Sequence, residues 1–300
     1  MTRSPKPQTL RLARFAALGA AVLLAAPGAA SAWTGDKEVA RITTFGGSCS
    51  GCELSGRKMN GAQFHGANFA SAALVGSDLR DARFIGANFS GADLSRADLS
   101  DSQMHGSNFA GANLSSARFS SVTANGVNFS GADLSRADMR DMDAKGSNFS
   151  GAKLAGANLS DTQLTGSTFS RANASGVSFA DAVLRAANLG KGVFRRASFR
   201  DADLSSATLM GGDFDGADFR DANLRYANIS GVDLSKARNL EQEQVAQACG
   251  DGGTRLPAGL VLKGCGGGAG RRIVVRVPGP PAPPAPPAPP ATPRYVVEID

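Results

Sequence analysis

The sequence predicts an all-β fold, a parallel β-solenoid in which each lap of the chain is twenty residues long. A large apolar residue stands at almost every fifth position from Leu54 to Leu234, which fits neither the period of a helix nor the alternation of an ordinary strand. The same residue types return after twenty residues. Only 6 % of the chain is aromatic and 37 residues are glycine. This composition suits a repeat architecture better than a globular core.

Each five-residue unit carries a small residue two positions before its large one. Ala62 precedes Phe64 in this way, and Ala67 precedes Phe69. The pattern A-(D/N)-L-x-x resembles the pentapeptide-repeat family over about three fifths of the chain. The resemblance implies a right-handed quadrilateral parallel β-helix, in which each unit forms one of four sides and its small and large residues point inward. We assign residues 52–238 to this β-helix, which gives roughly nine laps at the strand spacing.

Sorting the chain by twenty supports four units per lap independently of that resemblance. Successive laps should lie about 4.8 Å apart, as neighbouring strands do, and offset aromatic rings can pack at that spacing. One column, the Phe ladder, should therefore stack along the core: Phe69, Phe89, Phe109, Phe129, Phe149 and Phe169. A second column, the Asn ladder, lies beside it: Asn68, Asn88, Asn108, Asn128 and Asn148.

Two further columns test the lap model. Glycine recurs from Gly66 to Gly166, which indicates a turn where a side chain would crowd the neighbouring lap. In another column Ala124 and Ala144 replace large residues, while the small positions of the same units are enlarged to Val122 and Met142. Because interiors are close-packed, this exchange of volume is expected only if both positions face one core.

The N-terminus predicts export. Residues 1–32 combine a basic lead, a short apolar run and the small-residue sequence Ala-Ser-Ala before Trp33, the layout of a secretory signal peptide cleaved at Ala32–Trp33. Residues 33–51 then form an N-terminal segment or cap. An uncleaved membrane anchor is the weaker alternative because the run is short and contains Gly and Pro. We therefore expect a periplasmic or secreted protein without a transmembrane segment.

Residues 239–265 should form a helical, cysteine-containing cap at the C-terminal end. Asn239 is the expected N-cap, with Gln242 completing a capping box. The four cysteines stand in two pairs at opposite ends of the rod, which excludes a four-cysteine zinc site. In an exported chain, the disulfides Cys49–Cys52 and Cys249–Cys265 are favoured over buried free thiols. The second would close a loop of about 16 residues, worth on the order of 3 kcal/mol.

Residues 266–300 are rich in Gly and Pro and contain two short strand candidates, 271–277 and 294–300. Between them lies a polyproline stretch, 278–293, which would reach about 50 Å as a stiff spacer. One interpretation is an arm that presents residues 294–300 to a partner. The other is a disordered tail, and composition alone does not choose between them.

A column of aspartates, the Asp ladder, is the most unusual surface feature. Neighbouring carboxylates about 4.8 Å apart repel by roughly 0.9 kcal/mol per pair even in water. The favoured explanation is that each carboxylate accepts a turn N–H, and a cation-binding strip is the alternative. The ladder consists of Asp81, Asp101, Asp141, Asp161, Asp181, Asp201 and Asp221.

The charge pattern and the residue inventory favour a non-enzymatic scaffold. The net charge is +6, yet residues 62–238 hold 18 basic and 18 acidic residues, so no basic face for nucleic acid is expected. His65 and His105, the two histidines, imply no catalytic pair, and we predict neither a catalytic residue nor a cofactor. We expect a structural or protein-interaction role in the cell envelope, through the repeat faces or the tail, and leave open a homodimer. The family resemblance also implies an alternative, a DNA-mimicking protein that binds DNA gyrase, which the neutral repeat region and the export signal disfavour.

Overall fold

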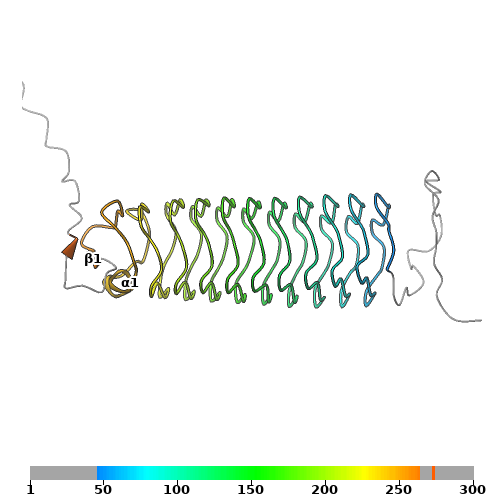
Figure 1. Cartoon of the computed structure of the whole chain (residues 1–300), viewed down its shortest axis with the longest axis horizontal. Coiled ribbons are helices and arrows are strands. Elements are labelled where there is room, and N and C mark those ends of the chain that lie inside the picture. The colour runs from blue at the N-terminus through cyan, green and yellow to red at the C-terminus, as the bar shows by residue number, and fades with distance from the viewer. Residues whose placement is uncertain (1–45, 264–271, 274–300) are drawn as a thin grey trace, which may run out of the picture.

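The computed structural model describes residues 46–263 and 272–273, and most of this chain forms a straight rod of stacked laps (Figure 1). From Ser48 to Thr208, parallel bridges join every fifth residue to the residue twenty positions later, in four separate ladders. The predicted β-solenoid is therefore confirmed. The first ladder begins with Ser48↔Asn68, before residue 52, the predicted start of the coil. The other three begin with Glu53↔Ala73, Lys58↔Asp78 and Gln63↔Arg83.

Each unit bonds to the next lap and then turns a corner. The N–H of Phe109 donates to the carbonyl of Asn128 at 2.7 Å, and the N–H of Ala112 closes the corner on the carbonyl of Phe109 at 3.0 Å. Gly111, the third residue of this turn, has φ +65°, as a type II turn requires. The residue at this position is left-handed at every corner from Gly51 to Gly231, whatever its type.

The glycine column is explained by this backbone conformation and not by lack of space. Gly66 and Gly86 have φ of +61° and +64°, and a Cβ added at either would meet nothing within 4 Å. The predicted crowding is therefore wrong. Glycine is favoured here because it adopts positive φ without the steric cost that other residues bear.

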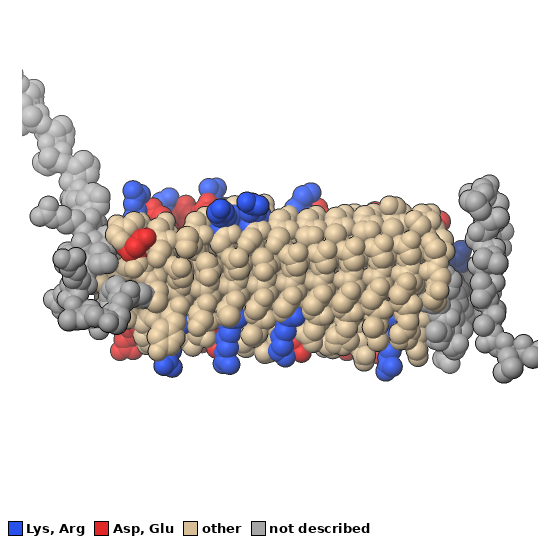
Figure 2. Space-filling view, viewed as in Figure 1, with Lys and Arg blue, Asp and Glu red and all other residues tan. Residues whose placement is uncertain are grey.

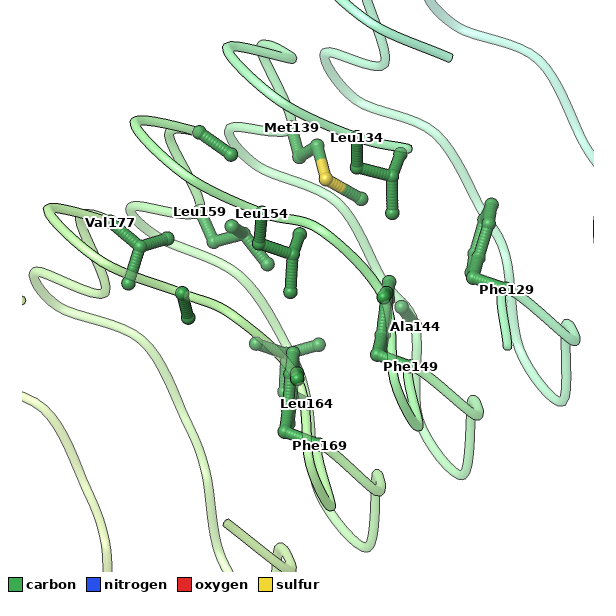
Figure 3. Packing of buried hydrophobic residues seen from close by; sticks show 14 of the residues in the cluster. Phe129, Leu134, Met139, Ala144, Phe149, Leu154, Leu159, Leu164, Phe169 and Val177 are labelled. Atoms are coloured by element: carbon green, nitrogen blue, oxygen red, sulfur yellow. The ribbon is translucent and has the colours of Figure 1, made fainter. Parts of the chain in front are cut away.

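The core is a continuous stack of inward side chains (Figure 3). The rings of Phe89 and Phe109 stack with centroids 4.8 Å apart, those of Phe109 and Phe129 at 5.4 Å, and those of Phe149 and Phe169 at 4.7 Å. In two laps a large residue stands at the usual small position and an alanine at the usual large one. Both positions still face the core there, because all four side chains are at most 1 % exposed: Val122, Ala124, Met142 and Ala144.

Toward the C-terminal end, the aromatic stack moves to other sides of the rod. Phe179, Phe199 and Phe219 form one stack, with centroids 5.3 and 5.2 Å apart, and Phe194 stacks on Phe214 at 5.1 Å. The small positions before this second pair are Gly192 and Gly212. A Cβ at either would lie 2.6 Å from the following Phe ring, so these glycines make room for the rings.

Helix α1 (Gln242–Gln247) lies at the C-terminal end of the rod (Figure 1), where its Val245 is fully buried. Its N-cap is Glu241, whose N–H donates to the side chain of Gln244 at 2.7 Å. The predicted N-cap Asn239 is wrong: it lies outside the helix at φ +53°, a left-handed value rather than the extended backbone of an N-cap. Strands β1 (Leu262–Lys263) and β2 (Arg272–Ile273) follow and pair antiparallel.

Both ends of the rod carry a disulfide-bonded cysteine. Cys49 and Cys52 are bonded to each other across a corner and pack against the core. Cys249 is also disulfide-bonded, and its predicted partner Cys265 lies outside the described residues. The predicted signal peptide, with its predicted cleavage position Ala32–Trp33, and residues 264–271 and 274–300 lie outside them as well. No helix of the described part of the chain is long and apolar enough to cross a bilayer.

Candidate functional site

The geometry of the coil leaves three residues of each five-residue unit for contact with other molecules. The residues on either side of each bridge point inward, as Ala112 and Leu114 do on the side centred on Asn113. The bridge residue itself points outward. Of the two corner residues that follow, the first is half-buried in most units and the second is nearly always exposed. Any functional surface therefore consists of outward columns spaced by one lap, on a rigid backbone.

The Asn ladder is a hydrogen-bonded stack along one such column. The Nδ2 of Asn108 donates to the Oδ1 of Asn88 at 3.1 Å, and that of Asn128 to Asn108 at 3.1 Å. Each Oδ1 also accepts the N–H two residues later, for example that of Ser130 on Asn128 at 3.1 Å. With donors and acceptors satisfied in this way, the column is a rigid, neutral strip.

The corner N–H groups are satisfied by the bridge column and not by the Asp ladder. The N–H of Ser135 donates to Asp133 at 3.1 Å, and that of Ser115 to Asn113 at 3.2 Å. Among the described residues, no member of the Asp ladder accepts such a bond, and all seven are exposed. The predicted role as turn acceptors is therefore wrong. These aspartates occupy left-handed corners, with φ between +55° and +61°, a conformation that Asp tolerates better than most residues.

The Asp ladder does not assemble a metal centre. Within residues 46–263 and 272–273, no three His, Cys, Asp or Glu side chains come together as a cation would need. His65 is exposed and His105 half-buried, at equivalent corners two laps apart. Within the described residues, the members of the Asp ladder and the two histidines therefore do not come together at one site.

Charged side chains of the rod are arranged in local pairs of opposite sign. Arg80 donates to Asp78 with nitrogen–oxygen distances of 2.7 and 2.8 Å, and Arg140 donates to Asp138 at 2.8 Å. These guanidinium hydrogen bonds hold the pKa of Asp78 and of Asp138 below the usual value for aspartate. Pairing of this kind balances charge mainly along the bridge columns, whereas no member of the Asp ladder forms an ion pair within the described residues. Figure 2 shows one long face on which charged groups lie mainly along the two edges.

Comparison with known proteins gives the family. The family model for pentapeptide repeats matches residues 48–84, 77–115, 102–141, 112–151 and 211–238, and the model for a pentapeptide repeat region matches 142–219. No curated protein matches the chain in sequence.

The chain is also similar to solved structures, among them the following three. HetL, a pentapeptide repeat protein involved in heterocyst differentiation regulation from the cyanobacterium Nostoc sp. strain PCC 7120, is 26 % identical with a TM-score of 0.56, over 63 % of this chain and 87 % of its own. A pentapeptide repeat protein from the Arabidopsis thaliana thylakoid lumen is 33 % identical with a TM-score of 0.23, over 34 % and 69 %. QnrB1, a plasmid-mediated fluoroquinolone resistance protein, is 23 % identical with a TM-score of 0.39, over 58 % and 90 %. With its repeat models covering most of the chain and its four-sided ladder in place, this protein belongs to the pentapeptide-repeat family.

Proposed function

We propose that this protein is an exported, non-enzymatic scaffold that binds another protein of the cell envelope along its repeat faces. The observation that supports this most is the regular outer surface: rigid columns such as the Asn ladder repeat one side chain at the strand spacing, about 4.8 Å. Such a surface suits an extended partner that makes the same contact on several laps, as repeat proteins commonly do.

Export follows from the sequence of residues 1–32 and is tested by the N-terminus of the purified protein. We expect the periplasmic or secreted form to begin at Trp33. Replacing Ala32 by Pro should block cleavage and retain the precursor, whereas Ala29→Pro, outside the small-residue motif, should be processed. A cytoplasmic protein that still begins at Met1 would refute the proposal.

The partner is sought by photo-crosslinking in cells from the outward columns. A crosslinking residue at Asn108 or Asn128 should capture the same envelope protein, because both positions lie on one face. The same residue at Asp138, on another side of the rod, serves as the control. Capture without any preference among the sides would argue against a specific face. Repeating the experiment without residues 266–300 asks whether the tail contributes.

The alternative of a DNA mimic that binds gyrase is supported by the exposed carboxylates of the Asp ladder alone. Mimicry requires a face that resembles an array of phosphates. On this rod, however, arginines such as Arg80 and Arg140 directly precede members of the ladder. Recovery of gyrase in the crosslinking experiment would favour this alternative over the envelope scaffold.

A further inference from the structure

One side of the rod opens between two laps near the C-terminal end. One lap earlier, the side is closed by four backbone hydrogen bonds of ordinary length, 2.7 to 3.1 Å. The four bonds, each written donor N–H to acceptor C=O, are Lys191 to Met210, Phe194 to Asp213, Arg196 to Asp215 and Asp213 to Gly192.

None of the four equivalent bonds forms between residues 211–216 and 231–236, in the part of the chain that the structure describes. The parallel bridge expected between Asp213 and Asp233 is missing as well. A cavity of about 380 Å³ lies between the two segments, lined by Gly211, Gly212, Asp213, Asp215, Gly231, Asp233, Ser235 and Lys236. We call this cavity the slot. Its unbonded groups are the N–H of Gly211, Phe214, Gly216 and Asp233, and the C=O of Gly212, Ser230, Asp233 and Ser235.

The slot is an interruption within the ladder and not the end of it. On its N-terminal side, Asp213 is bonded to the preceding lap at 2.9 Å. On its C-terminal side, the N–H of Leu234 donates to Arg255 at 2.8 Å, and the N–H of Arg255 donates to Val232 at 3.0 Å. Two facing rows of unbonded N–H and C=O groups form a template for an extended chain.

We propose that the slot takes up residues 294–300 of a second copy of this chain as an inserted strand. Val297, Glu298 and Ile299 repeat the small, acidic and large residues of Val232, Asp233 and Leu234. Phe214 and Leu234, on the two sides of the slot, are at most 1 % exposed and must move apart for a strand to enter. As an added rung, residues 297–299 would then place two apolar side chains in the core and one carboxylate outside. Their backbone would bond to both rows of the slot and so restore the ladder.

The choice of a second copy as the donor rests on the polyproline arm, the first of the two interpretations of the tail. Residues 278–293 favour polyproline geometry, a stiff spacer of about 50 Å. The spacer follows β2, which lies at the same end of the rod as the slot (Figure 1). A spacer of that length and stiffness would carry residues 294–300 away from their own slot and within reach of that of a neighbour.

Charged groups around the slot can accommodate the incoming carboxylate. Asp213 pairs with Arg195 of the preceding lap at 2.5 Å, and Asp233 pairs with Arg255 of the following segment at 3.3 Å. Neither of these ion pairs crosses the slot. Lys236 instead reaches across the slot to Asp215 at 3.1 Å. When the two segments are held apart by a strand, Lys236 is the group available to pair with Glu298.

The first test measures self-association of the purified full chain by analytical ultracentrifugation over a dilution series. Glu298→Pro removes a backbone N–H and disfavours a central strand, so association should weaken by about tenfold or more, the loss of at least one or two backbone hydrogen bonds. Ala288→Pro, in the spacer, is the matched control and should associate as the parent chain does. The inference does not rest on the envelope role, because only the purified protein is measured.

The second test closes the slot. Oxidation of the double variant Asp213→Cys/Asp233→Cys should abolish association, whereas Asp203→Cys/Asn223→Cys, on a bonded side, should not. The two pairs are matched because Asp203 also pairs with an arginine, Arg185, at 2.5 Å. In the parent chain, hydrogen exchange at Phe214 and Gly216 should slow as the concentration rises. A monomer at all concentrations, association unaffected by Glu298→Pro, or slow exchange already in the monomer would each overturn the proposal. If the slot pair does not oxidise, the Glu298→Pro comparison decides alone.

Discussion

At the scale of the residue, each position in the five-residue unit answers to one physical demand. Inward positions must fill a shared volume, and the left-handed corner must tolerate positive φ. This explains why Gly, Asp, Ser, Arg and even Tyr226, at φ +60°, share one position. The aspartates of the Asp ladder are therefore chosen by the backbone, and their carboxylates remain free for solvent.

Asp161, with φ +61°, tests this explanation. Asp161→Val should cost about 1–2 kcal/mol, because a β-branched residue is strained in the left-handed region. Asp161→Gly should change stability by less than about 1 kcal/mol. Denaturant unfolding of both variants makes the comparison. If the glycine variant lost as much as the valine variant, the carboxylate itself would be required.

Phe129 tests the core. Its ring stacks on Phe109 and on Phe149 and is fully buried, so Phe129→Ala should cost about 3–5 kcal/mol. The neighbouring Asn128→Ala loses hydrogen bonds on the surface and should cost only about 1–2 kcal/mol. Equal losses, measured by urea unfolding, would contradict the inward placement of the ring.

At the scale of the element, one side chain of the C-terminal helix makes two hydrogen bonds to the last lap, beside the backbone bond from Tyr226 to Gln247 and the buried side chain of Val245. Gln244 donates to the carbonyls of Phe219 and Ala222 at 2.7 and 2.8 Å and accepts the N–H of Glu241. Both carbonyls lie where the regular coil ends. The carbonyl of Phe219 also accepts the N–H of Ala222 at 3.1 Å, whereas the Ala222 carbonyl has Gln244 as its donor among the described residues.

Gln244→Ala should therefore destabilise the C-terminal end by about 1–3 kcal/mol, the cost of leaving such groups unsatisfied. Gln247→Ala, on the exposed end of the same helix, is the control and should have little effect. Hydrogen exchange of the last two laps resolves the change locally. Equal protection in both variants would show that Gln244 does not hold the helix.

The outer columns predict a dependence on pH. Because arginine hydrogen bonds lower the pKa of Asp78 and Asp138 in the folded state, the stability that they add is complete above the unfolded value, about 3.9. It is lost as the pH falls through the lower folded value. Melting temperatures should therefore fall below about pH 4. Arg140→Gln should reduce that fall, whereas Arg136→Gln, at a corner where the guanidinium meets no carboxylate of the described chain, should not. A fall of the same size in Arg140→Gln would refute the link.

At the scale of the whole molecule, stability depends on laps that stack in register. A deletion of residues 106–125 removes one whole lap and leaves the Phe ladder aligned. A deletion of residues 106–120 keeps the five-residue phase but turns every later unit onto another side. We expect the first variant to melt close to the parent, because repeat proteins sum the stabilities of their units, and the second to melt well below it. Similar melting temperatures would show that the twenty-residue columns do not matter.

Much of this architecture could be predicted because each unit contacts mainly the nearby units of its own lap and the units one lap away. The period of five assigns Phe129 to the core, and the period of twenty places it over Phe109. The conformation of the corner could not be predicted in the same way: a column of Gly or Asp is compatible with crowding, with turn hydrogen bonds or with positive φ. Only the backbone coordinates distinguish these. The N-cap at Glu241 was missed for a similar reason, because Asn239 has the residue type of an N-cap but a left-handed backbone.

The sequence by itself determined the family, the four-sided coil and the inward columns, since those follow from spacing that repeats over many laps. Only the tertiary structure decided where the coil departs from its own rule. Val232, Asp233 and Leu234 follow the repeat pattern as well as any unit. Yet the structure has no backbone hydrogen bond between residues 231–236 and residues 211–216 of the preceding lap. A local pattern specifies which way side chains point, but the bonding of two laps depends on how both are held at their ends, and this is a property of the folded molecule.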